Sequence, residues 1–210
     1  MYIPKRFLQD DITKLKGMMA AHSFATIITQ NESEIEANHM PLVLNKSANK
    51  DVLQGHIAKV NPLWKSLKDK SEVLIIFNGP NCYISPNYYP TKKENGKVVP
   101  TWNYVSVHVK GIVSFIHDKQ WILSMLNNLT DHYEANQPVP WSVSDAPQAY
   151  IDKMLSAIVG LEIEIVSITG KWKISQDKTE VNIKGIIEGL SQETGSNANK
   201  IAKLVKEHLS

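Results

Sequence analysis

Three short segments of this 210-residue sequence place aromatic side chains beside amide, hydroxyl or ammonium groups. They are Gly-His-Ile-Ala-Lys-Val-Asn-Pro-Leu-Trp at 55–64, Pro-Thr-Trp-Asn-Tyr-Val-Ser-Val-His at 100–108 and Gly-Lys-Trp-Lys-Ile-Ser-Gln at 170–176. A planar heteroaromatic ligand with an anionic end needs this mixture, because flat side chains cover the ring while donors and cations hold the anion. Flavin mononucleotide (FMN) is a ligand of this kind.

The first segment contains a candidate phosphate site. Asn61 and Pro62 are typical of a helix start, since Asn can cap free N–H groups and Pro needs no N–H at the first helical position. Lys59 adds a cation near the N-terminus of that helix, where the helix dipole favours an anion. An ordinary solvated strand lysine is the alternative interpretation of Lys59.

Other chemistry has weaker support in the sequence. The motifs of P-loop, dinucleotide-binding, serine-hydrolase and zinc-protease sites are absent, so no catalytic residue is assigned. His39, His56 and His108 fall on expected strands without a recognised ligand spacing, and no metal site is expected. Trp102 and Trp172 could cover a ring, or could belong to the core or a dimer interface.

Hydrophobic periodicity indicates which elements must hold these segments. Helical spacing follows Asp10 and Asp11, and recurs after Asp118, around 147–159 and in the tail from 181. Runs rich in Val, Ile and Thr between 24 and 60, at 73–77, through 82–85, at 98–116 and at 161–168 indicate strands. Asn78-Gly-Pro predicts a turn, and a switch of parity near Val166 predicts a bulge or bend.

These elements predict an α+β fold, an antiparallel split β-barrel of about six to seven strands with flanking helices. We expect one domain over residues 1–178 and a helical extension over 179–210. The polar loop at 86–97 is expected to be mobile without ligand.

Composition limits the setting in which the protein works. Cys82 is the single cysteine, so no internal disulfide can form. The first residues contain no apolar stretch of the length of a signal peptide or membrane span, and the expectation is a cytoplasmic protein without membrane contact. A net charge of +2 gives little general attraction to nucleic acid, so any DNA contact needs a local patch such as the lysines at 200–206.

Taken together, the clusters resemble the PaiB-like family of FMN-binding negative transcriptional regulators. The resemblance also includes Met-Tyr-Ile-Pro at 1–4, His-Met-Pro-Leu at 39–42, Phe-Asn-Gly-Pro at 77–80, Tyr-Ile-Ser-Pro at 83–86 and Ile-Val-Gly at 158–160. It implies a split barrel related to the pyridoxamine-phosphate-oxidase-like flavoproteins, which form homodimers with FMN between subunits.

The resemblance also implies roles for individual residues. Lys59, Asn61 and Lys65 would lie toward the phosphate, and Trp102, Asn103 and Tyr104 near the ring or the ribityl chain. The third segment would complete the pocket, from the same subunit or its partner. The full set of expected cofactor-binding residues is His39, His56, Lys59, Asn61, Trp64, Lys65, Trp102, Asn103, Tyr104, Lys171, Trp172, Lys173, Ser175 and Gln176.

Three functional classes stay open at this point. The first is a regulator that senses flavin or redox state and influences transcription, through its own contact with DNA or through a partner. The second is an FMN-dependent oxidoreductase acting on a small molecule, with the flavin performing the redox step. The third is an interaction module that has lost its flavin.

Overall fold

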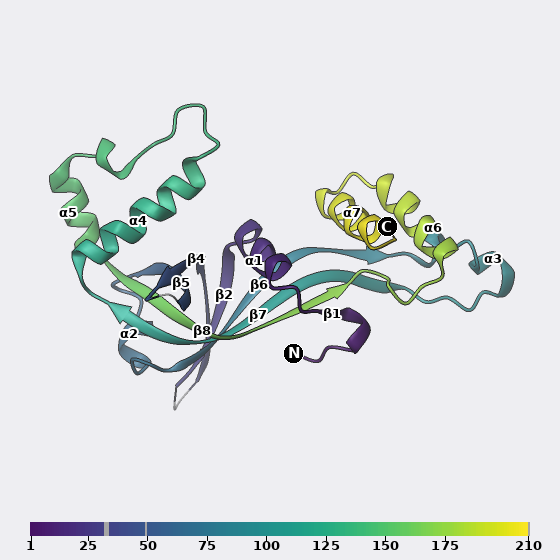
Figure 1. Ribbon diagram of the computed structural model, residues 1–210, viewed down its shortest axis with the longest axis horizontal. Coiled ribbons are helices and arrows are strands. Elements are labelled where there is room, and N and C mark those ends of the chain that lie inside the picture. Colours follow the sequence, from purple (N-terminus) through teal and green to yellow (C-terminus); the bar gives the residue numbers. More distant parts are fainter. Residues whose placement is uncertain (32–33, 49, 210) are drawn as a thin grey trace. The chain divides into compact units, whose positions relative to one another are not determined.

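The computed structural model describes residues 1–31, 34–48 and 50–209. It combines helices with antiparallel strands (Figure 1). In chain order the elements are η1 (Lys5–Phe7), β1 (Leu8–Gln9), α1 (Ile12–Ala21), β2 (Phe24–Gln30), β3 (Ile35–Pro41), β4 (Val43–Ser47), β5 (Lys50–Ala58), α2 (Leu63–Ser66), β6 (Glu72–Ile84), η2 (Pro86–Tyr88), α3 (Lys92–Asn95), β7 (Thr101–Ile116), α4 (Lys119–Glu134), η3 (Val143–Asp145), α5 (Gln148–Ser156), β8 (Ile158–Lys173), α6 (Glu180–Ser191) and α7 (Ser196–Leu209).

The strands follow the order β3-β2-β6-β7-β8-β5-β4, and β1 pairs with β8. The chain divides into two compact units. Unit 1 comprises residues 1–18, 78–108 and 169–210, and unit 2 comprises residues 19–77 and 109–168. The long strands β6, β7 and β8 contribute residues to both units. The sequence-based division at residue 178 stays a prediction.

Unit 2 has a core built from alternating strand residues. Ile27, Ile75, Leu53 and Ile163 are fully buried, and the last two are direct partners between β5 and β8. A second cluster joins α4 to α5 through Ile122, Met125, Ile151 and Leu155. Alternation of this kind buries one face of a strand and leaves the other free for polar groups.

Unit 1 includes α6 and α7, which contact each other through their apolar faces (Figure 1). Ile183, Ile186 and Leu190 are buried on α6, and Ile201 and Val205 are buried on α7. The spacing of three and four residues is the helical period expected from the sequence.

Local helix signals in the sequence are confirmed. The Asp11 side chain accepts a hydrogen bond from the N–H of Thr13 at 2.9 Å, at the start of α1. Asp118 caps α4 by accepting from the N–H of Trp121 at 2.7 Å. Along β8, the consecutive exposed residues Val166 and Ser167 interrupt the alternation, at the place where a change of parity was expected.

The turn predicted at 78–80 is wrong. β6 runs without a break from Glu72 to Ile84. Gly79 instead allows close packing, since a Cβ there would lie 2.9 Å from the Met18 side chain and 3.0 Å from Cβ of Val105. The segment expected to be a loop at 86–97 contains η2 and α3.

Gly111 in unit 2 is a second glycine that packs closely against its neighbours, and this contact predicts an effect on stability. A Cβ on Gly111 would meet the side chain of Ile163 and lie 2.7 Å from the backbone oxygen of Glu164. We expect Gly111→Ala to lower the free energy of unfolding by about 1–3 kcal/mol, because a packed strand must move to admit a methyl group. Urea denaturation followed by circular dichroism measures the change.

Gly17→Ala is the matched control. Gly17 lies inside α1, and nothing comes within 4 Å of an added Cβ. The same methyl group should there raise the free energy of unfolding by about 0.5–1 kcal/mol through helix propensity. A Gly111→Ala protein as stable as the parent would show that the strand contact has room to spare.

Candidate functional site

The expected cofactor-binding residues fall into two groups, one in each unit. Unit 2 contains those at positions 39–65, namely His39, His56, Lys59, Asn61, Trp64 and Lys65. Unit 1 contains those at positions 102–104 and 171–176, namely Trp102, Asn103, Tyr104, Lys171, Trp172, Lys173, Ser175 and Gln176.

In the unit 2 group, the turn after β5 brings Lys59, Asn61, Trp64 and Lys65 together. The Asn61 amide donates to the side-chain oxygen of Asn38 at 2.8 Å, and its own oxygen accepts from the N–H of Leu63 at 2.9 Å. The Trp64 indole donates to the backbone oxygen of Lys59 at 2.9 Å. Asn61 therefore fixes the turn, and α2 is a single turn of four residues.

The cations of this group are available to an anion. Lys59 and Lys65 are exposed, and neither forms an ion pair with a described residue. The Lys65 ammonium lies 5.0 Å from the centroid of the Trp64 ring, a cation–π distance. The contact orients the ammonium without neutralising it.

The two histidines of this group differ in environment. His39 is exposed on β3, where its ring stacks on Phe24 at 6.4 Å. His56 is partly buried on β5, its Nδ1 has no hydrogen-bond partner, and burial lowers its pKa. The imidazole of His56 is therefore neutral at pH 7.

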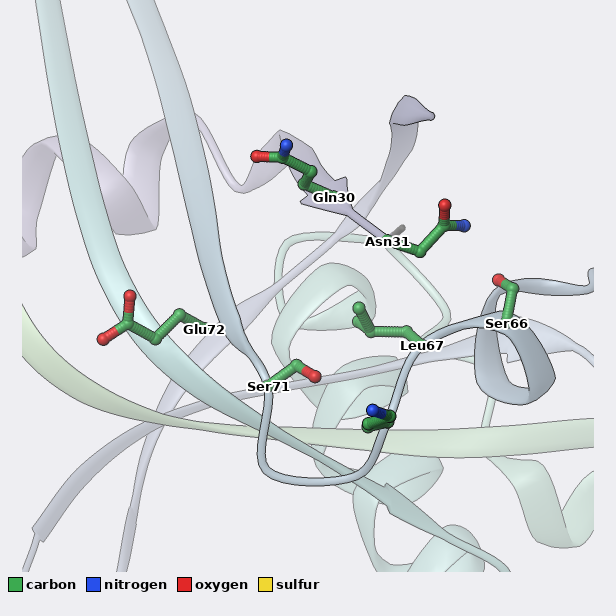
Figure 2. Close-up of a pocket in the computed structure, with 7 residues that line it drawn as sticks. Gln30, Asn31, Ser66, Leu67, Ser71 and Glu72 are labelled. Carbon is green, nitrogen blue, oxygen red and sulfur yellow. The ribbon is translucent and has the colours of Figure 1, made fainter. Parts of the chain in front are cut away.

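A cavity of about 820 Å³ in unit 2 lies at the other end of α2 (Figure 2). Figure 2 shows the residues around it: Gln30 at the end of β2 with Asn31 after it, Ser66 at the end of α2 with Leu67 after it, and Ser71 followed by Glu72, the first residue of β6. None of the expected cofactor-binding residues lines this cavity.

In the unit 1 group, Lys171 is a buried cation. It is 9% exposed, and its ammonium donates to the backbone oxygen of Tyr2 at 3.2 Å. The Tyr104 and Tyr2 rings lie 5.1 and 6.0 Å from the ammonium. No carboxylate of the described residues pairs with it. Two aromatic rings therefore take the place of the carboxylate that normally accompanies a buried ammonium group.

Asn103 on β7 and Ser175, two residues after the end of β8, form a buried polar pair. Asn103 is fully buried and donates from Nδ2 to the Ser175 hydroxyl at 2.8 Å, while its Oδ1 has no partner. Ser175 has a φ of +68°, a left-handed conformation that is costly for a residue other than glycine. The hydrogen bond from Asn103 helps to hold that conformation.

Lys173 and Trp102 complete the polar surface of this group. The Lys173 ammonium donates to the Thr101 hydroxyl and, at 2.6 Å, to the backbone oxygen of Trp102. Burial lowers the pKa of Lys173, and the nearby Asp177 carboxylate partly opposes that shift. The Trp102 ring is half exposed and its indole donates to Asn81 at 3.2 Å.

Gln176 and Trp172 have structural roles within unit 1. The Gln176 side chain accepts from the N–H of Ile174 at 2.8 Å and donates to the backbone oxygen of Trp172 at 2.6 Å. Trp172 itself is buried. Both residues shape the end of β8 from which Lys171 and Lys173 extend.

Sequence reasoning missed several residues that complete these groups. Tyr2, Asn81 and Thr101 contact the unit 1 group, and Asn38 contacts the unit 2 group. Tyr2 and Asn81 lie in or next to segments that carried the family resemblance, which was the available signal.

The single cysteine is not activated. Burial, followed by the charge of Glu193, raises the pKa of the Cys82 thiol to about 11.

None of the described helices combines the length and the apolar composition needed to cross a lipid bilayer. Among the described residues, no three His, Cys, Asp or Glu side chains gather in a way that could hold a metal ion.

Two solved structures with a similar fold are of proteins named for flavin or haem. The FAD and heme binding protein from Mycobacterium smegmatis matches with a TM-score of 0.61 and 14% identity, covering 84% of this chain and 78% of that one. The flavocytochrome Anf3 from Azotobacter vinelandii matches with a TM-score of 0.56 and 14% identity, covering 81% and 72%. At this identity the matches show the fold, an α+β split barrel.

Sequence relatives cover the chain almost completely. The "Protease synthase and sporulation protein PAI 2" of Bacillus subtilis is 32% identical over 209 residues, which is 100% of this chain and 98% of that protein. An uncharacterised protein of Emericella nidulans is 31% identical over 99% of this chain and 97% of its own length. The family model described as "Putative FMN-binding domain" matches residues 1–167. The chain therefore belongs to this FMN-binding family, the PaiB-like split-barrel proteins, and its cofactor is FMN.

Proposed function

We propose that this protein is a homodimeric, cytoplasmic transcriptional regulator of the negative type, which binds FMN and responds to flavin or its redox state. The observation that carries the proposal lies in unit 1, where the buried Lys171 ammonium pairs with no carboxylate of the described residues and the fully buried Asn103 has a side-chain oxygen without a hydrogen-bond partner among them.

The residues fit the chemistry of FMN. The phosphate needs cations, and Lys59, Lys65 and Lys171 have no ion pair with a described carboxylate. The ring system needs flat apolar surface, which the half-exposed Trp102 ring offers. Bound FMN would supply reversible electron transfer, and the protein would position it and set its electrostatic environment.

A second copy of the chain is supported by an uncovered sheet face in unit 2. Ile28 and Leu74 are direct partners between β2 and β6, and both are only partly buried. They line a groove of about 550 Å³ together with the exposed side chains of Ile35 and Val166. An apolar sheet face of this kind is typical of an interface between copies.

The regulatory role is supported by full-length similarity to PAI 2, whose name refers to protease synthesis and sporulation. Direct DNA contact would need a basic surface, and α7 offers one. Lys200, Lys203 and Lys206 are exposed along it, with Lys203 only 3.9 Å from Glu207. Contact through a partner protein would not require these lysines.

The alternative function is an FMN-dependent oxidoreductase acting on a small molecule. One observation favours it: His56 is neutral at pH 7 with an unpartnered Nδ1, a suitable group for proton transfer. Nothing identifies a substrate. Turnover of NAD(P)H with a second substrate, catalysed by the FMN-loaded protein, would favour the enzyme over the regulator.

FMN titration tests the cofactor residues. We expect Lys171→Met, Lys59→Ala and Trp102→Ala each to raise the FMN dissociation constant by roughly tenfold, because each removes a charge or a ring surface worth about 1–2 kcal/mol. Quenching of flavin fluorescence gives the constants. Lys5→Met, an exposed lysine outside both groups, is the control. If FMN binds and all three variants keep parental affinity, the residue assignment is wrong although the family holds.

Analytical ultracentrifugation tests the dimer. Val166 is 63% exposed and Ile35 is 71% exposed, so Val166→Glu with Ile35→Glu should leave the subunit folded. We expect the double variant to sediment as a monomer and the parent as a dimer, because a carboxylate buried at an interface without a partner is costly. Val139→Glu, at an exposed apolar residue elsewhere in unit 2, should stay dimeric. A dimeric double variant would place the interface on another surface.

Promoter binding tests the regulatory role. Mobility shifts with DNA upstream of the protein's own gene should occur with FMN-loaded protein and weaken as salt increases, since lysine–phosphate contacts release counterions. Replacing Lys200, Lys203 and Lys206 with Gln should reduce both the affinity and the salt slope if α7 touches DNA. A shift restored only by cell extract would indicate a partner, and no effect of gene deletion on any transcript would contradict regulation.

A further inference from the structure

Another cavity lies within unit 1, on the face of β8 that is opposite to Lys171 and Lys173. Side chains alternate along a strand, so Trp172, which lies between these two lysines, points to the other face. Trp172 lines the cavity, which has a volume of about 320 Å³, within the range of small-molecule sites. Of the residues expected to bind FMN, only Trp172 and Gln176 belong to its lining. The cavity is therefore distinct from the place where Lys171 and Lys173 would hold FMN.

Segments that are far apart in the sequence supply the polar groups of the lining. Arg6 comes from η1, Gln9 from β1, Lys14 from α1 and Glu207 from α7. β1 pairs with β8, and Gln9 lies opposite Gly170 in this pairing. The Gln9 side chain also accepts a hydrogen bond from the N–H of Asp11 at 3.0 Å, just before α1 begins. Both contacts fix the wall that β1 and the start of α1 form beside Trp172.

Two cations of the lining have no counter-ion. Neither the Arg6 guanidinium nor the Lys14 ammonium forms an ion pair with a residue in the described ranges. The carboxylate of the lining is that of Glu207, which lies 3.9 Å from the Lys203 ammonium on the same helix. Two positive charges and one negative charge leave one positive charge in the lining, before His208 is counted.

Trp172 provides an independent indication of a ligand. The residue is 9% exposed, and its indole N–H donates to no residue that the structure describes. The N–H is nevertheless accessible, because the described side-chain atoms that are both closed to solvent and without a hydrogen-bond partner belong to His56, Tyr89 and Asn103. An indole N–H in a buried ring usually has a partner. Since the exposed part of Trp172 lines the cavity, an acceptor on a ligand there would satisfy this donor.

The rest of the lining is mainly apolar. Ile174 is buried, Leu204 is partly buried, and Leu8 is 47% exposed where it borders the cavity. A hydrocarbon group in the cavity would cover Leu8 and part of the Trp172 ring, and removal of this apolar surface from water would stabilise the complex. The ligand that fits this lining has a negative charge, an acceptor for the indole N–H and an apolar body.

We propose that this cavity binds a small monocarboxylate with an apolar body, whose carboxylate lies between Arg6, Lys14 and the Trp172 indole N–H. A guanidinium suits a carboxylate because its N–H groups can bind both oxygens. A single carboxylate also matches the one positive charge that remains, whereas a phosphate monoester carries more negative charge at pH 7. Binding does not depend on FMN. Because α7 carries the lysines proposed above to contact DNA, an effect of this ligand on DNA affinity would rest on the proposed function.

The test is an NMR titration of the full chain with benzoate, once without FMN and once with saturating FMN. We expect the indole N–H signal of Trp172 and the side-chain N–H signal of Arg6 to shift in the millimolar range in both titrations. The indole signal of Trp102, which is not part of the lining, should respond to FMN and not to benzoate. Trp172→Phe assigns the indole signal by removing it. Because the titration without FMN stands alone, a failed flavin proposal would not affect it.

Two analogues of benzoate separate the charge from the apolar contact. Benzyl alcohol keeps the ring without the charge, and should bind roughly tenfold more weakly because the charged hydrogen bonds are lost. Phenyl phosphate keeps the ring and carries more negative charge, and should also bind more weakly than benzoate because the lining has one positive charge to offer.

Substitutions of the lining charges have opposite expected signs. Arg6→Gln should weaken benzoate binding roughly fivefold through loss of a bidentate pair, and Lys14→Gln about threefold through loss of an exposed charge. Glu207→Gln should strengthen binding about threefold. Lys5→Gln removes an exposed charge next to Arg6 but outside the lining, so it is the matched control and should change nothing. Lys171→Met should leave benzoate affinity unchanged while it weakens FMN binding.

Four results would overturn the proposal. Benzoate could leave the Trp172 indole signal unmoved. Benzyl alcohol or phenyl phosphate could bind as tightly as benzoate. Arg6→Gln and Lys14→Gln could bind benzoate as tightly as the parent. FMN could displace benzoate and shift the Trp172 signal itself, in which case the cavity would belong to the flavin.

Discussion

The buried ammonium of Lys171 is the constraint on which the arrangement of the unit 1 group depends. A cation that is nine-tenths buried needs compensation, and in this protein the compensation comes from Tyr104, Tyr2 and one backbone oxygen. The neutral pair of Asn103 and Ser175 is also compensated incompletely, because Oδ1 of Asn103 is left without a hydrogen-bond partner. These side chains have more hydrogen-bonding atoms than the described residues satisfy, and a polar cofactor needs such unsatisfied groups in order to bind.

The unit 2 group works by a different principle. Asn61 uses its amide on Asn38 and on the N–H of Leu63, so the turn after β5 is fixed and Lys59 and Lys65 extend from it into solvent. Exposed ammonium groups attract an anion from a distance but contribute little once salt screens them. The contribution of the exposed lysines to ligand affinity should therefore fall strongly as ionic strength rises. The contribution of Lys171 should change little.

Local chemistry was predictable from the sequence, and contacts between distant segments were not. The helix starts after Asp11 and Asp118 depend on residues two or three positions away, which is why the sequence was sufficient to predict where these helices begin. Asn-Gly-Pro at 78–80 has the composition of a turn, but Gly79 lies within a strand because Met18 and Val105 leave no space for a side chain. Likewise, the contacts of Lys171 with Tyr2 and of Lys173 with Thr101 join segments far apart in the chain, and the sequence did not predict them.

The protonation of Cys82 restricts how this protein could respond to oxidants. With a pKa of about 11, only about one thiol in ten thousand is ionised at pH 7, and the thiolate is the form that peroxides and disulfides attack. Because this is the sole cysteine, no internal disulfide can form, and the scarcity of the thiolate disfavours oxidation to a sulfenic acid. Under the proposed function, a redox response would therefore rest on the isoalloxazine ring of FMN rather than on this thiol.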